Sequence, residues 1–292
     1  MTLEGLIVKS LSGFYYVRAE DKIIECRARG VMRKNGVTPL VGDRVKISVS
    51  DGLSSVDEVI ERRNFLIRPP VANVDRLYII SSYENPSPNT LLIDKQICTC
   101  EKQGIEPIIV LNKCDEGSFD DIRDIYVNAG FEVYIISCKT GEGISAIKQS
   151  LKRGISVFTG NSGVGKSSLL NALLPELNLR TGEVSNKLGR GRHTTRHVEL
   201  FDIGGGCLIA DTPGFSTIEC EPMLKESIAP LFREFEDYLC GCKFTSCSHT
   251  CEKGCSVLDA VNSGKIARSR HESYCELYKE ASMLNDWEVK TR

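Results

Sequence analysis

The stretch Gly160-Asn161-Ser162-Gly163-Val164-Gly165-Lys166-Ser167 decides the fold of this chain. It fits the phosphate-loop pattern G-x-x-x-x-G-K-[ST] in full. An apolar run over 155–159 precedes it and a helical run over 167–174 follows it, which is the strand–loop–helix context that the pattern requires. The stretch therefore predicts a nucleotide-binding α/β domain.

The residue types of this loop suit phosphate chemistry. Glycines let successive backbone N–H groups converge on phosphate oxygens at the start of a helix, where the helix dipole also favours anions. We expect Lys166 to reach the β- and γ-phosphates and the Ser167 hydroxyl to bind Mg²⁺. The predicted nucleotide contacts in this loop are Gly160, Asn161, Ser162, Gly163, Val164, Gly165, Lys166, Ser167 and Ser168.

A second motif, Asn112-Lys113-Cys114-Asp115, follows an apolar run over 107–111 and predicts which base is bound. A carboxylate at position 115 can accept hydrogen bonds from N1–H and the exocyclic amine of guanine. Adenine offers no matching pair of donors, so such a site discriminates strongly against it. We expect Asn112 to tie this loop to the phosphate loop and the stem of Lys113 to lie on the base.

The next strand end supplies a second loop at the base. Ser137, Cys138 and Lys139 follow the apolar run 133–137, and their backbone is expected to meet the guanine oxygen. Together with Asn112, Lys113 and Asp115 they complete the predicted GTP specificity.

Two motifs after the phosphate loop are expected to contact the γ-phosphate. Asp211-Thr212-Pro213-Gly214 follows an apolar strand, so Asp211 can hold Mg²⁺ through water and the Gly214 N–H can touch the γ-phosphate. The basic, glycine-rich stretch 189–196 has the composition of a switch loop. Thr195 is favoured as its Mg²⁺ ligand, with Thr194 as the alternative.

The residue after this last motif leaves a gap in the catalytic site. Ras-like enzymes carry there a glutamine that orients the attacking water, whereas this chain has Phe215, which neither donates nor accepts a hydrogen bond. His193 is the nearest candidate to replace it. A solvated histidine in a basic loop explains the residue equally well. The predicted catalytic residues are His193, Lys166 and Thr195.

The remaining sequence predicts a module on each side of the α/β domain. Five short β-rich runs with glycine turns before residue 64 predict a small closed barrel of the OB type, with an SH3-like barrel as the alternative. Apolar strands alternating with helices then indicate a mostly parallel sheet. The helix-rich segment from 221 carries five cysteines in a short stretch, typical of a metal site. The expected domains are 1–67, 68–220 and 221–292.

The runs behind that division can be given by residue number. The barrel strands are expected over 5–8, 14–17, 22–26, 44–47 and 56–60. The sheet strands are expected over 76–81, 107–111, 133–137, 155–159 and 207–210, with helices over 91–103, 119–129, 143–151 and 167–174.

The order of the nucleotide motifs is rotated. The base motifs come first, followed by the phosphate loop, the switch loop and the Asp211 motif. With a barrel in front and a cysteine cluster behind, the whole chain resembles the circularly permuted ribosome small-subunit-dependent GTPases, the RsgA (YjeQ, YloQ) family. The resemblance includes 68–70, 191–195 and 211–215.

This resemblance implies a GTPase that binds the small ribosomal subunit and its 16S rRNA, is stimulated by it, and acts late in its maturation. It also implies the role of His193. A zinc knuckle with the ligands Cys242, Cys247, His249 and Cys255 follows from it, and a Cys₃His set suits structural Zn²⁺. On spacing alone, Cys240 and Cys251 compete as ligands.

Composition limits how RNA could be bound. The net charge of −2 gives no global attraction to nucleic acid, so contacts must come from local patches. The barrel offers Arg27, Arg29, Arg33 and Lys34, and a second patch is expected at Lys265, Arg268 and Arg270. A basic run is more often a solvated face, and a signalling or scaffolding GTP switch is the competing hypothesis. We expect a cytoplasmic protein, because no signal peptide or membrane span is visible, and a monomer.

Overall fold

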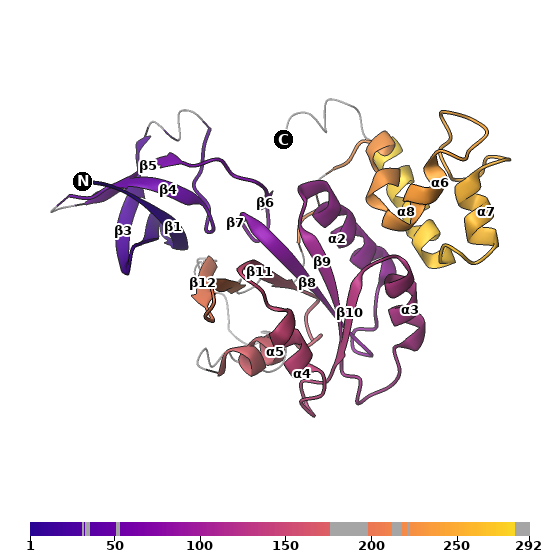
Figure 1. The fold of residues 1–292 in the computed structure, drawn as a ribbon, viewed down its shortest axis with the longest axis horizontal. Helices are drawn as coiled ribbons and strands as arrows, with labels where there is room; N and C mark the ends of the chain where they lie inside the picture. Colours follow the sequence, from indigo (N-terminus) through magenta and orange to yellow (C-terminus); the bar gives the residue numbers. More distant parts are fainter. Residues whose placement is uncertain are drawn as a thin grey trace, which may run out of the picture.

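A computed structural model gives the fold, and it describes residues 1–30, 32, 36–50, 53–175, 198–211, 218–220 and 222–283. The chain is elongated, with a β-barrel, a central sheet with helices, and a helical module in a row (Figure 1). Several predicted site residues lie outside the described part: Arg33, Lys34, His193, Thr194, Thr195, Gly214 and Phe215.

The N-terminal strands close into a five-stranded barrel. Successive strands pair in the order β1, β2, β3, β5, β4, and β4 returns to pair with β1. This ring confirms the predicted barrel. The strands are β1 (Thr2–Leu11), β2 (Phe14–Ala19), β3 (Lys22–Ala28), β4 (Arg44–Ser48) and β5 (Ser54–Val59).

The central sheet follows in the order β10-β9-β8-β11-β13-β12. Its first five strands are parallel, and only β12 runs antiparallel to its neighbour. The mostly parallel sheet is therefore as predicted. The strands are β8 (Val74–Ser82), β9 (Glu106–Asn112), β10 (Glu132–Ile136), β11 (Gly154–Thr159), β12 (Val198–Asp202) and β13 (Cys207–Asp211).

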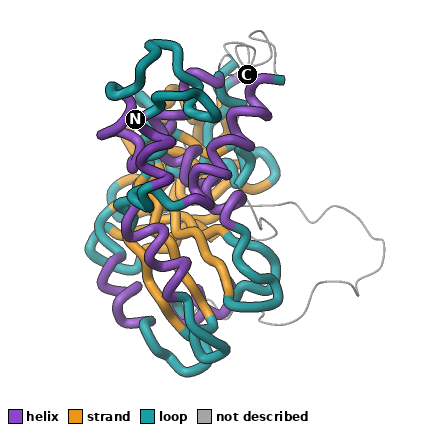
Figure 2. The backbone as a smooth tube through the Cα atoms, turned by 90° about the vertical axis from the view of Figure 1, so that its right-hand side faces the viewer, coloured by secondary structure: helices purple, strands orange, loops and turns teal. Residues whose placement is uncertain are grey.

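Helices pack against both faces of this sheet, and Figure 2 shows helices beside its strands. Ile97 of one helix and Tyr126 of another share a buried cluster with Ile79 and Ile109 on one face. On the other face, Ile147 and Leu169 pack with the opposite side chains of the same strands. The helices of the first face are α2 (Thr90–Gln103) and α3 (Asp120–Asn128), and those of the second are α4 (Ile144–Ser150) and α5 (Lys166–Leu173).

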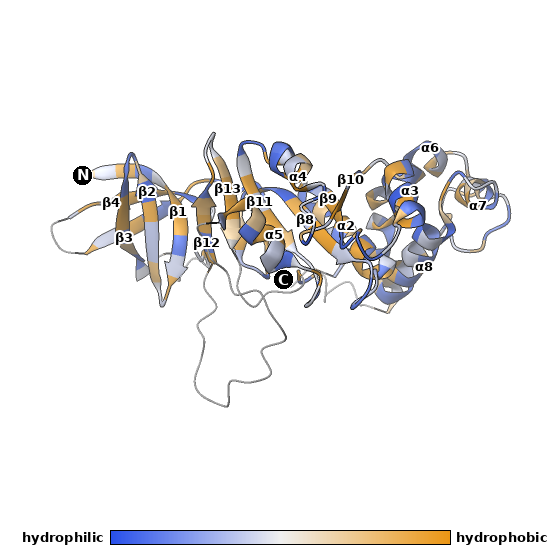
Figure 3. Cartoon of the chain, turned by 90° about the horizontal axis from the view of Figure 1, so that it is seen from below, coloured by the Kyte–Doolittle hydropathy of each residue, from blue (hydrophilic) through white to orange (hydrophobic). Residues whose placement is uncertain are grey.

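The barrel and the central sheet are joined edge to edge. β12 pairs antiparallel with β1, so that eleven strands form one continuous sheet, and Figure 3 shows β12 lying between β1 and β13. A buried hydrophobic cluster crosses the junction, with Val8 on the barrel side and Val198 and Leu200 on the other. No strand over 198–202 is predicted from the sequence, so this junction is a finding of the structure.

The linker and the C-terminal module complete the chain. A short hairpin connects the barrel to β8, and a separate buried cluster holds the C-terminal elements together. The hairpin strands are β6 (Phe65–Leu66) and β7 (Val71–Ala72), and the C-terminal elements are η2 (Lys225–Ser227), η3 (Ala229–Leu231), η4 (Arg233–Phe235), α6 (Glu236–Leu239), α7 (Ser256–Asn262) and α8 (Arg268–Ser282). Within the described ranges, no helix is both long and apolar enough to cross a bilayer.

The expectation that Arg270 contacts phosphate is wrong. Its side chain is 1% exposed, and its Nη1 lies 2.6 Å from Asp94 of α2 while its Nε lies 2.6 Å from Glu234. The guanidinium also stacks on Phe232, 4.6 Å from the ring centroid. Arg270 is thus a buried link between α8 and the central domain. Lys265 and Arg268 remain exposed.

Candidate nucleotide site and metal centre

The phosphate loop connects β11 to α5 at the carboxyl edge of the parallel sheet. Gly165 directly precedes the first turn of α5. Its backbone φ is +92°, a value that residues with a Cβ atom rarely adopt. A Cβ at Gly165 would stand 2.2 Å from Nδ2 of Asn112. The glycine therefore lets the base motif touch the phosphate loop, while Lys166 and Ser167 open the helix.

Asn112 is the residue that joins the three predicted nucleotide loops. It is 2% exposed at the end of β9. Its Nδ2 donates to the carbonyl of Val164 in the phosphate loop at 2.7 Å. Its Oδ1 accepts from the backbone N–H of Cys138 in the second base loop at 3.1 Å. Both halves of one amide are thus used, so the relative position of the loops is fixed.

Asp115 is held ready to accept hydrogen bonds. Ser137 donates its hydroxyl to Oδ1 at 2.6 Å, and Nζ of Lys139 lies 3.3 Å from Oδ2. The Ser137 hydroxyl itself accepts from the backbone N–H groups of Lys139 and Thr140. The hydrogen bond from Ser137 lowers the pKa of Asp115, against a smaller opposing effect of burial. The carboxylate is therefore an anionic acceptor at neutral pH.

Lys113 crosses to the loop after β8. It has φ +69°, and its Nζ donates to the carbonyl oxygen of Glu84 at 3.0 Å. The side chain therefore bridges two loops at the same sheet edge. The stem of Lys113 is expected to lie on the base, and Asp115 is expected to accept hydrogen bonds from it. Both are contacts with a ligand, so both stay predictions.

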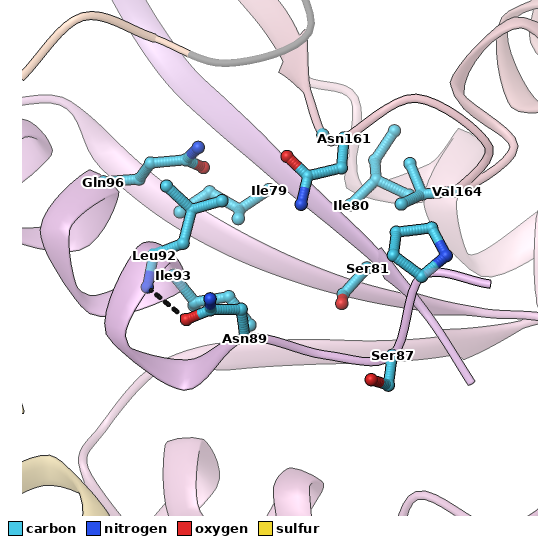
Figure 4. Close-up of a pocket in the computed structure, with 12 residues that line it drawn as sticks. Ile79, Ile80, Ser81, Ser87, Asn89, Leu92, Ile93, Gln96, Asn161 and Val164 are labelled. Carbon is cyan, nitrogen blue, oxygen red and sulfur yellow. Dashed lines mark hydrogen bonds between the residues drawn. The ribbon is translucent and has the colours of Figure 1, made fainter. Parts of the chain in front are cut away.

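A small cavity lies between α2 and the phosphate loop. Figure 4 shows Gln96, Leu92 and Ile93 of α2 on one side and Asn161 and Val164 on the other. Its volume is about 20 Å³, which is room for one water. Within the described ranges, Oε1 of Gln96 is buried without a hydrogen-bond partner. The cavity is therefore a packing feature behind the phosphate loop and too small for a ligand.

The residues expected at the γ-phosphate are only partly described. Asp211 ends β13, whose neighbour β11 leads into the phosphate loop, so its backbone lies at the same edge. Ser162, Gly163 and Ser168 lie in the phosphate loop and the first turn of α5, and their contacts with nucleotide stay predictions. Gly214 and the switch residues Thr194 and Thr195 are outside the described part, and their roles stay predictions.

Four metal-ligating side chains converge in the C-terminal module. The donor atoms of Cys242, Cys247, His249 and Cys255 all lie within 4.8 Å of one another. Cys242 Sγ is 3.8 Å from Cys255 Sγ and 3.4 Å from Nδ1 of His249, and Cys255 Sγ is 3.5 Å from the same nitrogen.

These separations fit a zinc ion. Zn–S bonds of about 2.3 Å and Zn–N bonds of about 2.0 Å in a tetrahedron place two sulfurs about 3.8 Å apart and sulfur and nitrogen about 3.5 Å apart. Cys240 and Cys251 are exposed and lie outside the group. Four protein ligands fill all four coordination positions of a tetrahedral zinc ion, as in structural zinc sites.

Neighbouring residues that the sequence analysis did not identify hold these ligands. The hydroxyl of Ser256 lies 3.2 Å from Cys242 Sγ. In α8, Tyr274 donates its hydroxyl to the carbonyl of Ser248 at 2.6 Å, and Nε2 of His271 lies 2.8 Å from the carbonyl of His249. For Ser256, the sequence offers one indication that it contacts the metal ligands, namely its position directly after a cysteine of the cluster. For Tyr274 and His271 the sequence offers no such indication, because they lie in a separate helix.

Comparison with known proteins agrees with this geometry. The RsgA GTPase family model matches residues 59–221, and the RsgA N-terminal domain model matches residues 4–56. The small ribosomal subunit biogenesis GTPase RsgA of Clostridium perfringens (strain SM101) is 42% identical over 281 residues, covering 95% of this chain and 98% of that protein.

Two solved structures share the whole fold. The crystal structure of YjeQ from Thermotoga maritima has a TM-score of 0.81 and 34% identity, over 98% of this chain and 100% of that one. YloQ, described as a circularly permuted GTPase, has a TM-score of 0.79 and 38% identity, over 97% and 96% of the two chains. With its barrel, rotated nucleotide motifs and cysteine cluster, this chain belongs to the RsgA family of circularly permuted GTPases.

Proposed function

We propose that this chain hydrolyses GTP to GDP and phosphate in the biogenesis of the small ribosomal subunit, and that the subunit stimulates the reaction. The contact set of Asn112 carries the proposal, because one buried amide holds the phosphate loop and both base loops in a single site. The RsgA relative named above is a small ribosomal subunit biogenesis GTPase.

The roles within the site follow from the chemistry of the residues. Lys166 would bind the β- and γ-phosphates, and Ser167, Thr195 and Asp211 would hold Mg²⁺. The ion would supply charge neutralisation at the phosphates. Asp115 would accept from the guanine donors, because its carboxylate is anionic and already oriented by Ser137.

The attacking water needs a residue to orient it, and Phe215 cannot do so. We assign this role to His193, in the stretch that the chain shares with the family. A partner that places His193 against the attacking water would speed hydrolysis, which explains how stimulation by a subunit could arise.

RNA contacts of the barrel form the finer part of the proposal. Arg27 and Arg29 are exposed at the end of β3. The Arg27 guanidinium lies over Phe14, 4.4 Å from the ring centroid, while Arg29 pairs with Asp57 at 2.8 Å. We propose that Arg27, Arg29, Arg33 and Lys34 contact 16S rRNA. Arg29 would contribute less, because Asp57 already neutralises it.

Three further parts of the proposal concern the molecule as a whole. We assign the barrel to 1–67, the GTPase domain to 68–220 and the zinc-binding domain to 221–292. The protein would act as a monomer in the cytoplasm. The zinc would have a structural role, since its four protein ligands leave no position for a substrate.

The decisive experiment is the rate of GTP hydrolysis with and without purified small ribosomal subunits, with large subunits as the control. We expect stimulation by small subunits only, and co-sedimentation that weakens steeply with salt, as for phosphate contacts. His193→Ala should bind GDP normally and lose about 10²-fold or more of the stimulated rate. Equal rates with either subunit would contradict the function, whereas full stimulation of His193→Ala would contradict only the role of His193.

A further inference from the structure

The barrel and the GTPase sheet meet in a narrow seam between β1 and β12. Two residue pairs define its register, Lys9 opposite Glu199 and Ser10 opposite Val198. Lys9 Nζ lies 2.8 Å from Glu199 Oε2. A second ion pair flanks the seam, since Nη1 of Arg18 lies 2.7 Å from Oδ2 of Asp202.

The seam continues in register to the predicted γ-phosphate site. Glu199 is opposite Lys9 on one side and opposite Asp211 on the other. The row Lys9–Glu199–Asp211 therefore runs from the barrel, through β12, to the residue expected to hold Mg²⁺. β12 also begins three residues after Thr195 in the sequence. One five-residue strand thus adjoins both motifs expected at the γ-phosphate.

Few residue pairs set the register of the seam. β1 carries a bulge between Ile7 and Lys9, at the point where it stops pairing with β4 and begins to pair with β12. Beyond that bulge, the seam has only two residue pairs. The side chains of these pairs therefore contribute much of what aligns β1 with β12. The Lys9 and Glu199 side chains are 29% and 28% exposed. Such an exposed pair contributes little to overall stability, and its removal should not unfold the protein.

We propose that Lys9 and Glu199 are positioning residues for GTP hydrolysis. They align β12 with the barrel, and through the sheet register with Asp211, so that a partner bound to the barrel acts on the γ-phosphate site. This inference rests on the proposed stimulation by small subunits. Neither residue contacts the nucleotide, and their effect passes through β12.

Charge reversal and charge exchange test this proposal. Lys9→Glu and Glu199→Lys each place two like charges across the seam, and the double variant restores an ion pair of reversed polarity. The matched control is Lys46→Glu, which breaks the Lys46–Glu58 pair of the same length, 2.8 Å, within the barrel. For each variant, kcat and KM for GTP are measured without subunits and with saturating small subunits. Co-sedimentation gives subunit affinity.

We expect the ratio of stimulated to unstimulated kcat to fall about two- to fivefold in each single seam variant, from the usual size of a cross-strand ion-pair effect. KM for GTP and subunit affinity should stay at the wild-type values, the double variant should recover the ratio, and Lys46→Glu should keep it. Wild-type stimulation in the single variants, or a double variant as poor as the singles, overturns the positioning role. A loss explained by weaker subunit binding overturns it too. A wild-type protein that subunits do not stimulate overturns the proposed function and this inference together.

Discussion

A single side chain, Asn112, holds together the loops of the proposed nucleotide site. Its amide lies where three loops meet, and each of its two polar atoms has a backbone partner. An aspartate at this position would lack the donor for Val164, and an alanine would remove the partners of both backbone groups. The proposed reading of the base by Asp115 therefore depends on a neighbouring residue that does not need to contact the base.

Replacing Asp115 by asparagine should change which base is bound. The amide N–H₂ would face the guanine donors, so we expect the Kd for GDP to rise about 100-fold, corresponding to roughly 3 kcal/mol for a hydrogen-bonded charge. Xanthosine diphosphate carries an acceptor where guanine has the amine, and its affinity should rise. Titration calorimetry with both nucleotides measures this. Glu116→Gln, one residue away and exposed, is the control, and an unchanged preference for GDP in Asp115→Asn would contradict the assignment.

At the scale of elements, α8 is attached to the GTPase domain by a buried charge. Arg270 lies between Asp94 of α2 and Glu234 of η4, and Tyr126 of α3 donates its hydroxyl to the same Asp94. Burial raises the pKa of Asp94, and the nearby Arg270 opposes that shift. Each charge in this group therefore depends on the others for its compensation.

Arg270→Met should destabilise the protein strongly, because it leaves two carboxylates buried without their cation. We expect a loss of about 3–5 kcal/mol in the free energy of unfolding, measured by urea denaturation. Adding Asp94→Asn and Glu234→Gln should recover part of this loss. Arg268→Met, two residues earlier and exposed, should cost almost nothing. Equal stability of the two methionine variants would show that the buried group contributes no net energy.

The metal cluster permits a second test at this scale. Cys247→Ser removes one ligand, so bound zinc, measured by atomic absorption, should fall from about one ion per chain to almost none, with loss of helical circular dichroism from α7 and α8. Cys251→Ser should retain the ion, because Cys251 lies outside the cluster. Zinc retained in the first variant, or lost in the second, would mean that the ligand set differs from the one assigned.

The sequence predicts elements well where the signal is local. Apolar runs and turn residues locate the barrel strands, the five parallel strands and the four sheet helices, because each pattern is complete within one segment. The junction of β12 with β1 is not predicted because these strands are distant in the sequence: Arg18 and Asp202, which pair across the seam, are 184 residues apart. Arg270 was assigned to the surface for the same reason, since Asp94 lies 176 residues away. Spacing could not separate Cys240 and Cys251 from the ligands either, because only the folded loop shows which sulfurs converge.

For the whole molecule, the shared cluster means that the barrel and the GTPase sheet should respond together to nucleotide. GDP stabilises the native state by mass action, about 2.7 kcal/mol at a hundredfold excess over Kd. We expect GDP to slow hydrogen exchange at Lys9 and Ser10 as much as in β12, because these amides should exchange through a common opening of the sheet. Amides at Lys22 and Ile23, where β3 pairs with β2 but not with β5, should not change. Protection confined to the GTPase sheet would show that the two parts open independently.

The join between β1 and β12 also has a consequence for how the protein is made. Residues 9 and 10 are among the first to leave the ribosome, yet their partners, residues 199 and 198, are synthesised roughly 10–40 s later at about 5–20 residues per second. The barrel can close early on its own, whereas its attachment to the sheet must wait until the phosphate loop has been translated. A nascent chain thus acquires the β1–β12 pairing only after its phosphate loop, so that a translation product truncated before residue 160 would carry the barrel without that loop.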